Sequence, residues 1–124
     1  MKAVLLVALG SAIGGASRYG VGLWLTPLAG QRWPYATLAV NVLGAILIGL
    51  VAGNAVSEGR WVINENFRLF LMAGVLGGFT TFSAYSLQTL ELLQAGYPER
   101  ALLYALGSVL LCLAGVAAGY WIAT

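Results

Sequence analysis

The fold of this chain depends on one segment, Gly74-Val75-Leu76-Gly77-Gly78-Phe79-Thr80-Thr81-Phe82-Ser83 (GVLGGFTTFS). The segment lies inside a long apolar run, yet it contains three glycines, two threonines and a serine. Glycine destabilises a helix interior by about 1 kcal/mol relative to alanine, and hydroxyl side chains compete for backbone hydrogen bonds. The segment therefore predicts an interruption in a helix that the flanking residues favour.

The composition around this segment is that of a membrane protein. The chain has 124 residues, of which 60% are hydrophobic and 8% charged, and its mean hydropathy is +0.89. Soluble domains carry about a quarter charged residues. A chain of this length has room for about four membrane-spanning helices and little else. We therefore expect an all-α integral membrane protein with a broken third helix, and a function located between the helices.

Polar connectors divide the sequence into four apolar runs within a single membrane domain, residues 1–124. The expected spans are residues 3–26, 36–56, 66–95 with a break near 75–81, and 99–123. The first run begins like a signal peptide but reaches spanning length, so we interpret it as a retained helix. Aromatic residues near the expected ends fit an interfacial belt: Trp24, Trp33, Tyr35, Trp61, Tyr97 and Trp121.

Small residues recur at the spacing that allows helices to pack closely in lipid. Three GxxxG pairs lie on three different spans: Gly10 and Gly14, Gly49 and Gly53, Gly115 and Gly119. Close backbone approach at such residues supplies packing energy where the hydrophobic effect between helices is weak. The pairs predict a tight helical assembly, within one chain or between chains.

The basic residues give almost no orientation signal. If the N-terminus is cytoplasmic, that side collects Lys2, Arg60 and Arg68, and the opposite side collects Arg32 and Arg100. Such a split hardly fixes a direction under the positive-inside rule. Both a single topology and an antiparallel homodimer are open on this evidence.

Several classes of function are disfavoured by composition. The net charge of +2 is too small and scattered for nucleic-acid binding. The chain has no His, no Asp and one cysteine, Cys112, which we interpret as a small buried hydrophobe. These counts remove the usual metal-ligand sets and any intrachain disulfide. An enzyme is the least favoured reading, since no nucleophile and base are paired.

Three polar residues fall inside or near the spans, where they are costly. Arg18 either reaches the interface or caps backbone carbonyls, or it anchors an anion or the broken segment. Asn41 either joins two helices or offers a neutral N–H donor to an anion. Glu91 is the only acid close to the membrane. A proton-coupled drug antiporter is thus the main rival to an anion pathway, but it needs an acid at depth.

The interruption adds its own chemistry. Unwound carbonyls at a break can coordinate a cation, and half-helix N-termini favour anions. Hydroxyls are supplied by Thr80, Thr81, Ser83 and Ser86. Phe79, Phe82 and Tyr85 come at three-residue spacing, which places them on roughly one face.

The motifs together resemble one known family. The pattern GxxGGxTTFSxxS at 74–86, Gly-Gly-Ala-Ser-Arg-Tyr at 14–19 and Thr-Leu-Ala-Val-Asn-Val at 37–42 look like the Fluc (CrcB) fluoride channels. The resemblance implies a passive, fluoride-selective channel in a bacterial-type inner membrane that releases fluoride from the cytoplasm. It also implies an antiparallel, dual-topology homodimer with two pores and a structural sodium ion at its centre.

The resemblance assigns roles to individual residues. The carbonyls of Gly77 and Thr80 correspond to sodium ligands, and Arg18 takes a structural role. Contacts with fluoride or the pore are implied for Asn41, Thr81, Phe82, Ser83, Tyr85 and Ser108. Two positions depart from the family pattern: Tyr85 stands in place of a phenylalanine, and Cys112 stands where a hydroxyl is expected. A scaffold subunit without transport remains a third reading of the sequence.

Overall fold

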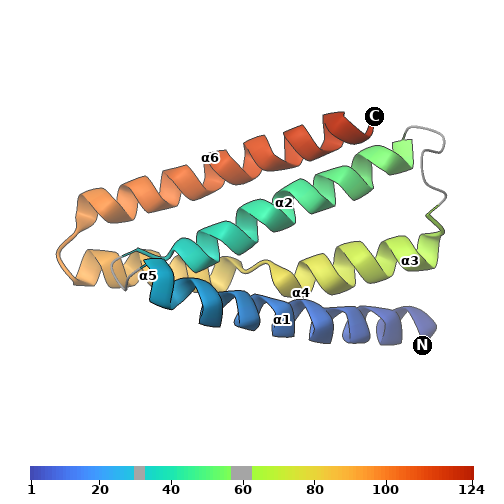
Figure 1. The fold of residues 1–124 in the computed structure, drawn as a ribbon, viewed down its shortest axis with the longest axis horizontal. Coiled ribbons are helices and arrows are strands. Elements are labelled where there is room, and N and C mark those ends of the chain that lie inside the picture. The colour runs from blue at the N-terminus through green and yellow to red at the C-terminus, as the bar shows by residue number, and fades with distance from the viewer. Residues whose placement is uncertain (30–32, 57–62) are drawn as a thin grey trace.

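The structure is a computed structural model that describes residues 1–29, 33–56 and 63–124, and these residues form a helical bundle (Figure 1). The elements are α1 (Lys2–Ala29), α2 (Tyr35–Val56), α3 (Glu65–Leu69), the π-helix η1 (Phe70–Leu76), α4 (Gly77–Phe79), α5 (Phe82–Gln94) and α6 (Pro98–Ala123). The elements from α3 to α5 follow one another along one line and together form the third span.

Four helical segments are long and apolar enough to cross a membrane: Lys2–Pro27, Tyr35–Val56, Glu65–Gln94 and Pro98–Ala123. Large apolar side chains such as Leu9 and Leu110 are exposed on their outer surfaces, as expected where lipid replaces water. For the part of the chain that the structure describes, the prediction of four apolar helices is confirmed.

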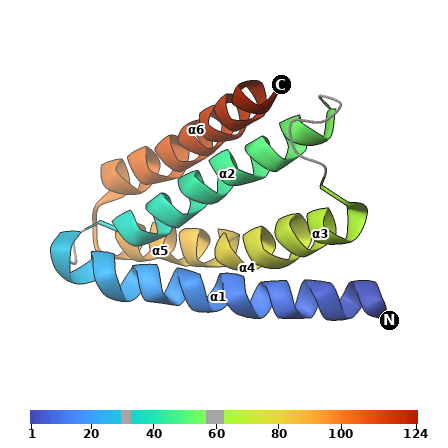
Figure 2. The ribbon, with the colours of Figure 1, turned by 45° about the vertical axis from the view of Figure 1, so that its right-hand side comes forward.

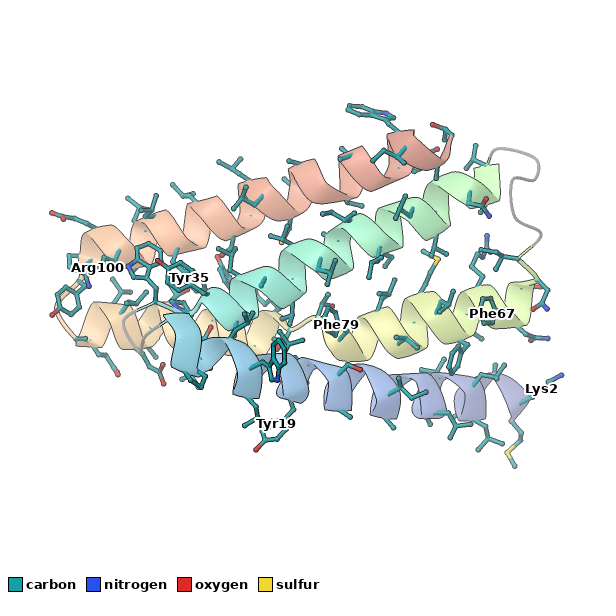
Figure 3. The ribbon with its side chains drawn as sticks, viewed as in Figure 1. Lys2, Tyr19, Tyr35, Phe67, Phe79 and Arg100 are labelled. Atoms are coloured by element: carbon teal, nitrogen blue, oxygen red, sulfur yellow. The ribbon has the colours of Figure 1, made fainter. Side chains whose placement is uncertain are left out.

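The spans lie in two pairs. In Figures 1 and 2, α1 runs beside the third span and α2 runs beside α6. The two members of each pair are parallel, and the chain direction of one pair is opposite to that of the other. Figure 3 places Lys2 and Phe67 at one end of the bundle, and Tyr35 and Arg100 at the other. Of the residues used for orientation and the aromatic belt, three lie outside the described residues: Arg32, Arg60 and Trp61.

The GxxxG glycines hold each pair of helices together within the chain. A Cβ atom on Gly10 would lie 2.7 Å from the carbonyl oxygen of Phe70, and one on Gly14 would overlap the backbone of Val75. Similarly, Cβ atoms on Gly49 and Gly53 would overlap backbone carbonyls of α6, and one on Gly119 would overlap a carbonyl of α2. These glycines therefore set the distance between backbones inside one subunit.

The third span is interrupted at its threonines, and the glycines beside them remain helical. Gly77 has φ −63° and ψ −36°, within the right-handed helical region. Thr80 and Thr81 are extended, with φ/ψ of −81°/158° and −151°/118°. The break therefore lies within the expected range, 75–81, but the threonines form it, and an interpretation of the glycines as the break itself is wrong. Gly78 instead allows close approach, because a Cβ atom there would lie 2.6 Å from the carbonyl oxygen of Ser11.

The extended pair also separates the aromatic residues that the sequence placed on one face. Phe79 is buried, whereas Phe82 is 77% exposed. Since two non-helical residues lie between them, the helical spacing rule does not apply across the break. Phe82 keeps its expected neighbour Tyr85, with ring centroids 5.2 Å apart.

Candidate functional site

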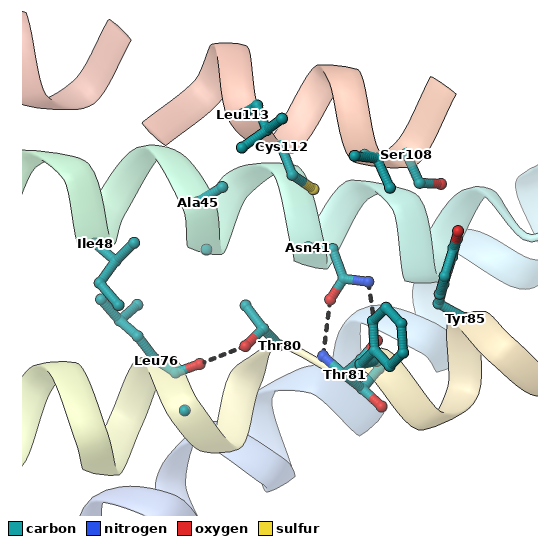
Figure 4. A pocket seen from close by; sticks show the side chains of 14 residues that line it. Asn41, Ala45, Ile48, Leu76, Thr80, Thr81, Tyr85, Ser108, Cys112 and Leu113 are labelled. Atoms are coloured by element: carbon teal, nitrogen blue, oxygen red, sulfur yellow. Dashed lines mark hydrogen bonds between the residues drawn. The ribbon is translucent and has the colours of Figure 1, made fainter. Parts of the chain in front are cut away.

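One side chain from another span binds the backbone of the interruption. The Asn41 Oδ1 atom of α2 accepts a hydrogen bond from the Thr81 backbone N–H at 2.7 Å, and Asn41 Nδ2 donates to the Thr81 carbonyl at 3.0 Å (Figure 4). The amide thus satisfies both backbone groups of an extended residue at membrane depth. Of the two interpretations of Asn41, the interhelical one is correct as far as it goes. One Nδ2 hydrogen remains beyond the one that Thr81 accepts.

The carbonyls of Gly77 and Thr80 are among those that lose their α-helical partners at the interruption. In a continuous α-helix the Thr81 N–H would donate to the Gly77 carbonyl, and the Ala84 N–H would donate to the Thr80 carbonyl. Here Thr81 donates to Asn41 instead, and Ala84 donates to the Thr81 hydroxyl at 3.2 Å. The carbonyls of Gly77 and Thr80 are therefore diverted from α-helical bonding at the same break.

A cavity of about 420 Å³ lies beside the break, between α2, the third span and α6. Its walls are mostly apolar, with polar groups contributed by all three spans (Figure 4). The predicted site residues that line it are Asn41, Gly77, Thr80, Thr81, Phe82, Tyr85 and Ser108. Cys112 lines it as well, as a half-buried free thiol.

Ser108 contributes a buried hydroxyl that makes no hydrogen bond of standard geometry among the described residues, although it lies close enough to Tyr104 to interact with its hydroxyl. The residue is 5% exposed, and its Oγ atom has no hydrogen-bond partner among the described residues. An unsatisfied buried hydroxyl costs about 1–3 kcal/mol. Ser108 lines the cavity, and its Oγ atom is itself buried in the wall.

Tyr85 uses its hydroxyl within the protein. The Tyr85 O–H donates to the Ala105 carbonyl of α6 at 3.2 Å. The ring lies between Phe82 and Tyr104, and its centroid is 5.5 Å from that of Tyr104. The hydroxyl proton is therefore directed away from the cavity, while the ring still lines it.

The two remaining hydroxyl residues have different positions. Thr81 is buried and caps α5 by accepting from Ala84, and its Oγ1 atom lies 3.2 Å from Ser83 Oγ. Ser83 is exposed and is not among the residues that line the cavity. The structure therefore brings Ser83 to the site only through its contact with Thr81.

Arg18 lies apart from this cavity. It is half-buried and lines a second cavity of about 670 Å³ between α1, α2 and α5, with Thr37, Thr81 and Gln88 also in the wall. The interpretation of Arg18 as a cap for carbonyls has no hydrogen bond to support it among the described residues. Thr81 lines both cavities and is the residue between them.

Two residues near the site were not predicted from sequence. Gly44 lines the first cavity one helical turn after Asn41. Tyr104 is 2% exposed, and its hydroxyl donates to Gln88 Oε1 at 2.9 Å. Their sequence signal is a three- or four-residue offset from a site residue, Gly44 from Asn41 and Tyr104 from Ser108, which is too common in helices to be decisive.

Fold and site together define a multi-pass helical membrane protein in which a broken span lines a mostly apolar cavity with a few polar residues. Residues 5–120 match the family described as "CrcB-like protein, Camphor Resistance (CrcB)", and the chain belongs to that family. The family resemblance in the sequence motifs is thus confirmed.

Several curated relatives match almost the whole chain. A Thermus thermophilus protein named fluoride-specific ion channel FluC is 51% identical over 116 residues, which cover 94% of this chain and 89% of that protein. A protein of the same name from Paramagnetospirillum magneticum is 46% identical over 124 residues, covering 100% and 97%. Another from Opitutus terrae is 43% identical, covering 97% and 91%.

Proposed function

We propose that this chain is a passive fluoride-selective ion channel of the bacterial-type inner membrane, which releases fluoride from the cytoplasm and so limits its toxicity. The proposal rests on the names of its relatives and on one observation. That observation is the cavity beside the break, which is lined by residues from separate spans that carry neutral hydrogen-bond donors.

Neutral donors suit a small, strongly hydrated anion. To enter the protein, fluoride must exchange its water shell for a close set of N–H and O–H groups. The free Nδ2 hydrogen of Asn41 and the buried hydroxyl of Ser108 are such groups. The edges of the Phe82 and Tyr85 rings carry partial positive charge and add a weaker contact. None of these groups carries a full charge that would trap the anion.

A structural sodium ion fits the donor chemistry at the break. Sodium prefers oxygen ligands, and the carbonyls of Gly77 and Thr80 are among those that lose their α-helical partners at the break. When bound, the ion would neutralise the partial charge of these oxygens. Asn41 and the Thr81 hydroxyl accept the two N–H groups that would bond these carbonyls in a continuous helix. The two carbonyl oxygens are therefore left without those helical donors.

An antiparallel homodimer with two pores is the assembly that we propose. The exposure of Phe82 and Gly77 supports it, since an open break cannot face lipid without a cover that satisfies its backbone. A second copy of the same break, related by a two-fold axis in the membrane plane, would supply that cover and the remaining carbonyls around one ion. Each subunit would then contribute one cavity to one pore.

Efflux from proteoliposomes tests the function. Vesicles loaded with fluoride or chloride and containing the purified chain are diluted into salt-free medium, and each anion is followed with a selective electrode. We expect fluoride to leave rapidly and chloride to be retained at the level of protein-free vesicles. Equal release of both ions would refute selectivity, and retention of both would refute the channel.

A further inference from the structure

Gly44 of α2 faces the side chains of Thr80 and Phe79, and the Thr80 methyl is the nearest group. Gly44 is buried and lies on the same face of α2 as Asn41, three residues earlier. A Cβ atom at Gly44 would overlap the Cγ2 methyl of Thr80 and would lie 3.5 Å from Phe79 Cδ1. The glycines that pack α2 against α6 differ, because a Cβ atom at Gly49 would meet the backbone of Val116 instead.

The direction of the Thr80 methyl is fixed by a second contact. The Thr80 hydroxyl donates to the Leu76 carbonyl at 3.0 Å (Figure 4). Because threonine is restricted at χ1, this bond also determines where the methyl points. The methyl points toward α2, into the space left by Gly44. Both contacts hold Thr80 in the extended conformation that begins the interruption.

We propose that Gly44 is a positioning residue for the interruption of the third span. Its missing side chain seats the Thr80 methyl, while Asn41 one turn earlier binds the backbone of Thr81. α2 thereby holds two consecutive extended residues at two points, and so sets the direction of the Thr80 carbonyl. The seating stands on the geometry alone, whereas its effect on ion flux rests on the proposed function.

The test is a double-mutant cycle of Gly44→Ala and Thr80→Ser. Serine keeps the hydroxyl that binds Leu76 and removes the methyl that the new Cβ would overlap. In the wild-type background we expect Gly44→Ala to lower the melting temperature in detergent by about 4 °C or more and fluoride efflux by about tenfold. In the Thr80→Ser background the same substitution should lower efflux by less than about twofold relative to Thr80→Ser alone.

The matched control is Gly49→Ala, which also overpacks α2 but against α6. Its defect should be the same with and without Thr80→Ser, because the two sites share no contact. If Gly44→Ala proves harmless, or if Thr80→Ser fails to relieve it, the seating role is wrong. If Gly44→Ala alone does not fold, recovery of folded protein in the double variant still supports the proposal, and no recovery refutes it.

A sodium titration adds a readout that general instability does not mimic. Melting temperatures are measured in NaCl and in N-methyl-D-glucamine chloride. We expect the stabilisation by sodium to be lost in Gly44→Ala and regained in the double variant. A wild-type chain without fluoride efflux would refute the proposed function, and the melting data of the cycle would still decide the role of Gly44.

Discussion

At the scale of single residues, Asn41 binds the backbone of the break, and in the proposed channel the same amide would also donate to the anion. Its oxygen and one of its amide hydrogens hold the Thr81 backbone, and its second hydrogen is left for the cavity. Either role alone would place an asparagine here, which is why sequence reasoning could not choose between them. The geometry leaves one amide hydrogen for the proposed transport role after the structural contacts are made.

The substitution Asn41→Asp tests this double role. A carboxylate oxygen would replace the Nδ2 donor, face the Thr81 carbonyl and place negative charge in the anion path. We expect fluoride efflux to fall by about tenfold or more and the stability to drop by about 1–3 kcal/mol. The measurements are electrode-monitored efflux and thermal unfolding in detergent.

The control is Asn66→Asp, the same chemical change at an exposed position in α3. It should leave both quantities near the wild-type values. Unchanged efflux in Asn41→Asp would remove Asn41 from the pathway, even if the stability fell.

For Ser108 we expect the opposite effect on stability from that of Asn41→Asp. Its buried hydroxyl has no partner among the described residues, so Ser108→Ala removes a desolvated polar group. We expect stability to stay constant or to rise by up to about 1 kcal/mol, while fluoride efflux falls by about tenfold. A structural serine would instead lose stability on truncation. The exposed Ser17→Ala in α1 serves as the control, and a parallel loss of stability and efflux in Ser108→Ala would contradict the assignment.

At the scale of elements, the interruption restarts as a helix because Thr81 caps it. Thr81 is the N-cap of α5, and its hydroxyl accepts the Ala84 N–H. The same bond takes away the N–H that would have paired with the Thr80 carbonyl. Capping and carbonyl exposure are thus one event, which links the start of α5 to the chemistry of the break.

Thr81→Val should separate this role from the bulk of the side chain. Valine keeps the shape but cannot accept a hydrogen bond, so we expect a loss of about 1 kcal/mol together with reduced fluoride efflux. Thr81→Ser, which retains the cap, should preserve most of the stability. Thr89→Val in the same helix removes a hydroxyl that bonds only to Tyr85 within α5. If both valine variants behave alike, the capping role is not what matters.

Sequence patterns predicted the elements better than the details of the break. Four apolar runs sufficed for the helices, because hydropathy is a local property of each run. The interruption lies within the expected range, 75–81, but its extended residues could not be identified from sequence, since the extended state of Thr81 is stabilised by Asn41, 40 residues away. The partner of the Tyr85 hydroxyl was left open for the same reason, because it depends on how α5 approaches α6.

At the scale of the whole molecule, the exposed break and the distribution of basic residues both favour pairing with an oppositely oriented copy. Phe82 and the break open on the outer surface of a bundle that is otherwise apolar. Lys2 lies at one end of the bundle and Arg100 at the other (Figure 3), so charge gives the chain little reason to choose one direction. A molecule that inserts in both directions can cover each break with an oppositely oriented copy.

Biasing the insertion of each copy tests this assembly. Glu65→Lys with Asn66→Lys adds positive charge at the end that carries Lys2, and Gln94→Lys with Glu99→Lys adds it at the end that carries Arg100. Since positively charged ends are retained in the cytoplasm, each double variant should insert in one direction only. Expressed alone, each should lose most fluoride efflux, because no oppositely oriented partner is made. Co-expression should restore efflux to about half of the wild-type level or more, since each copy then meets its complement. Full efflux from either variant alone would mean that one orientation suffices, and the antiparallel arrangement would have to be abandoned.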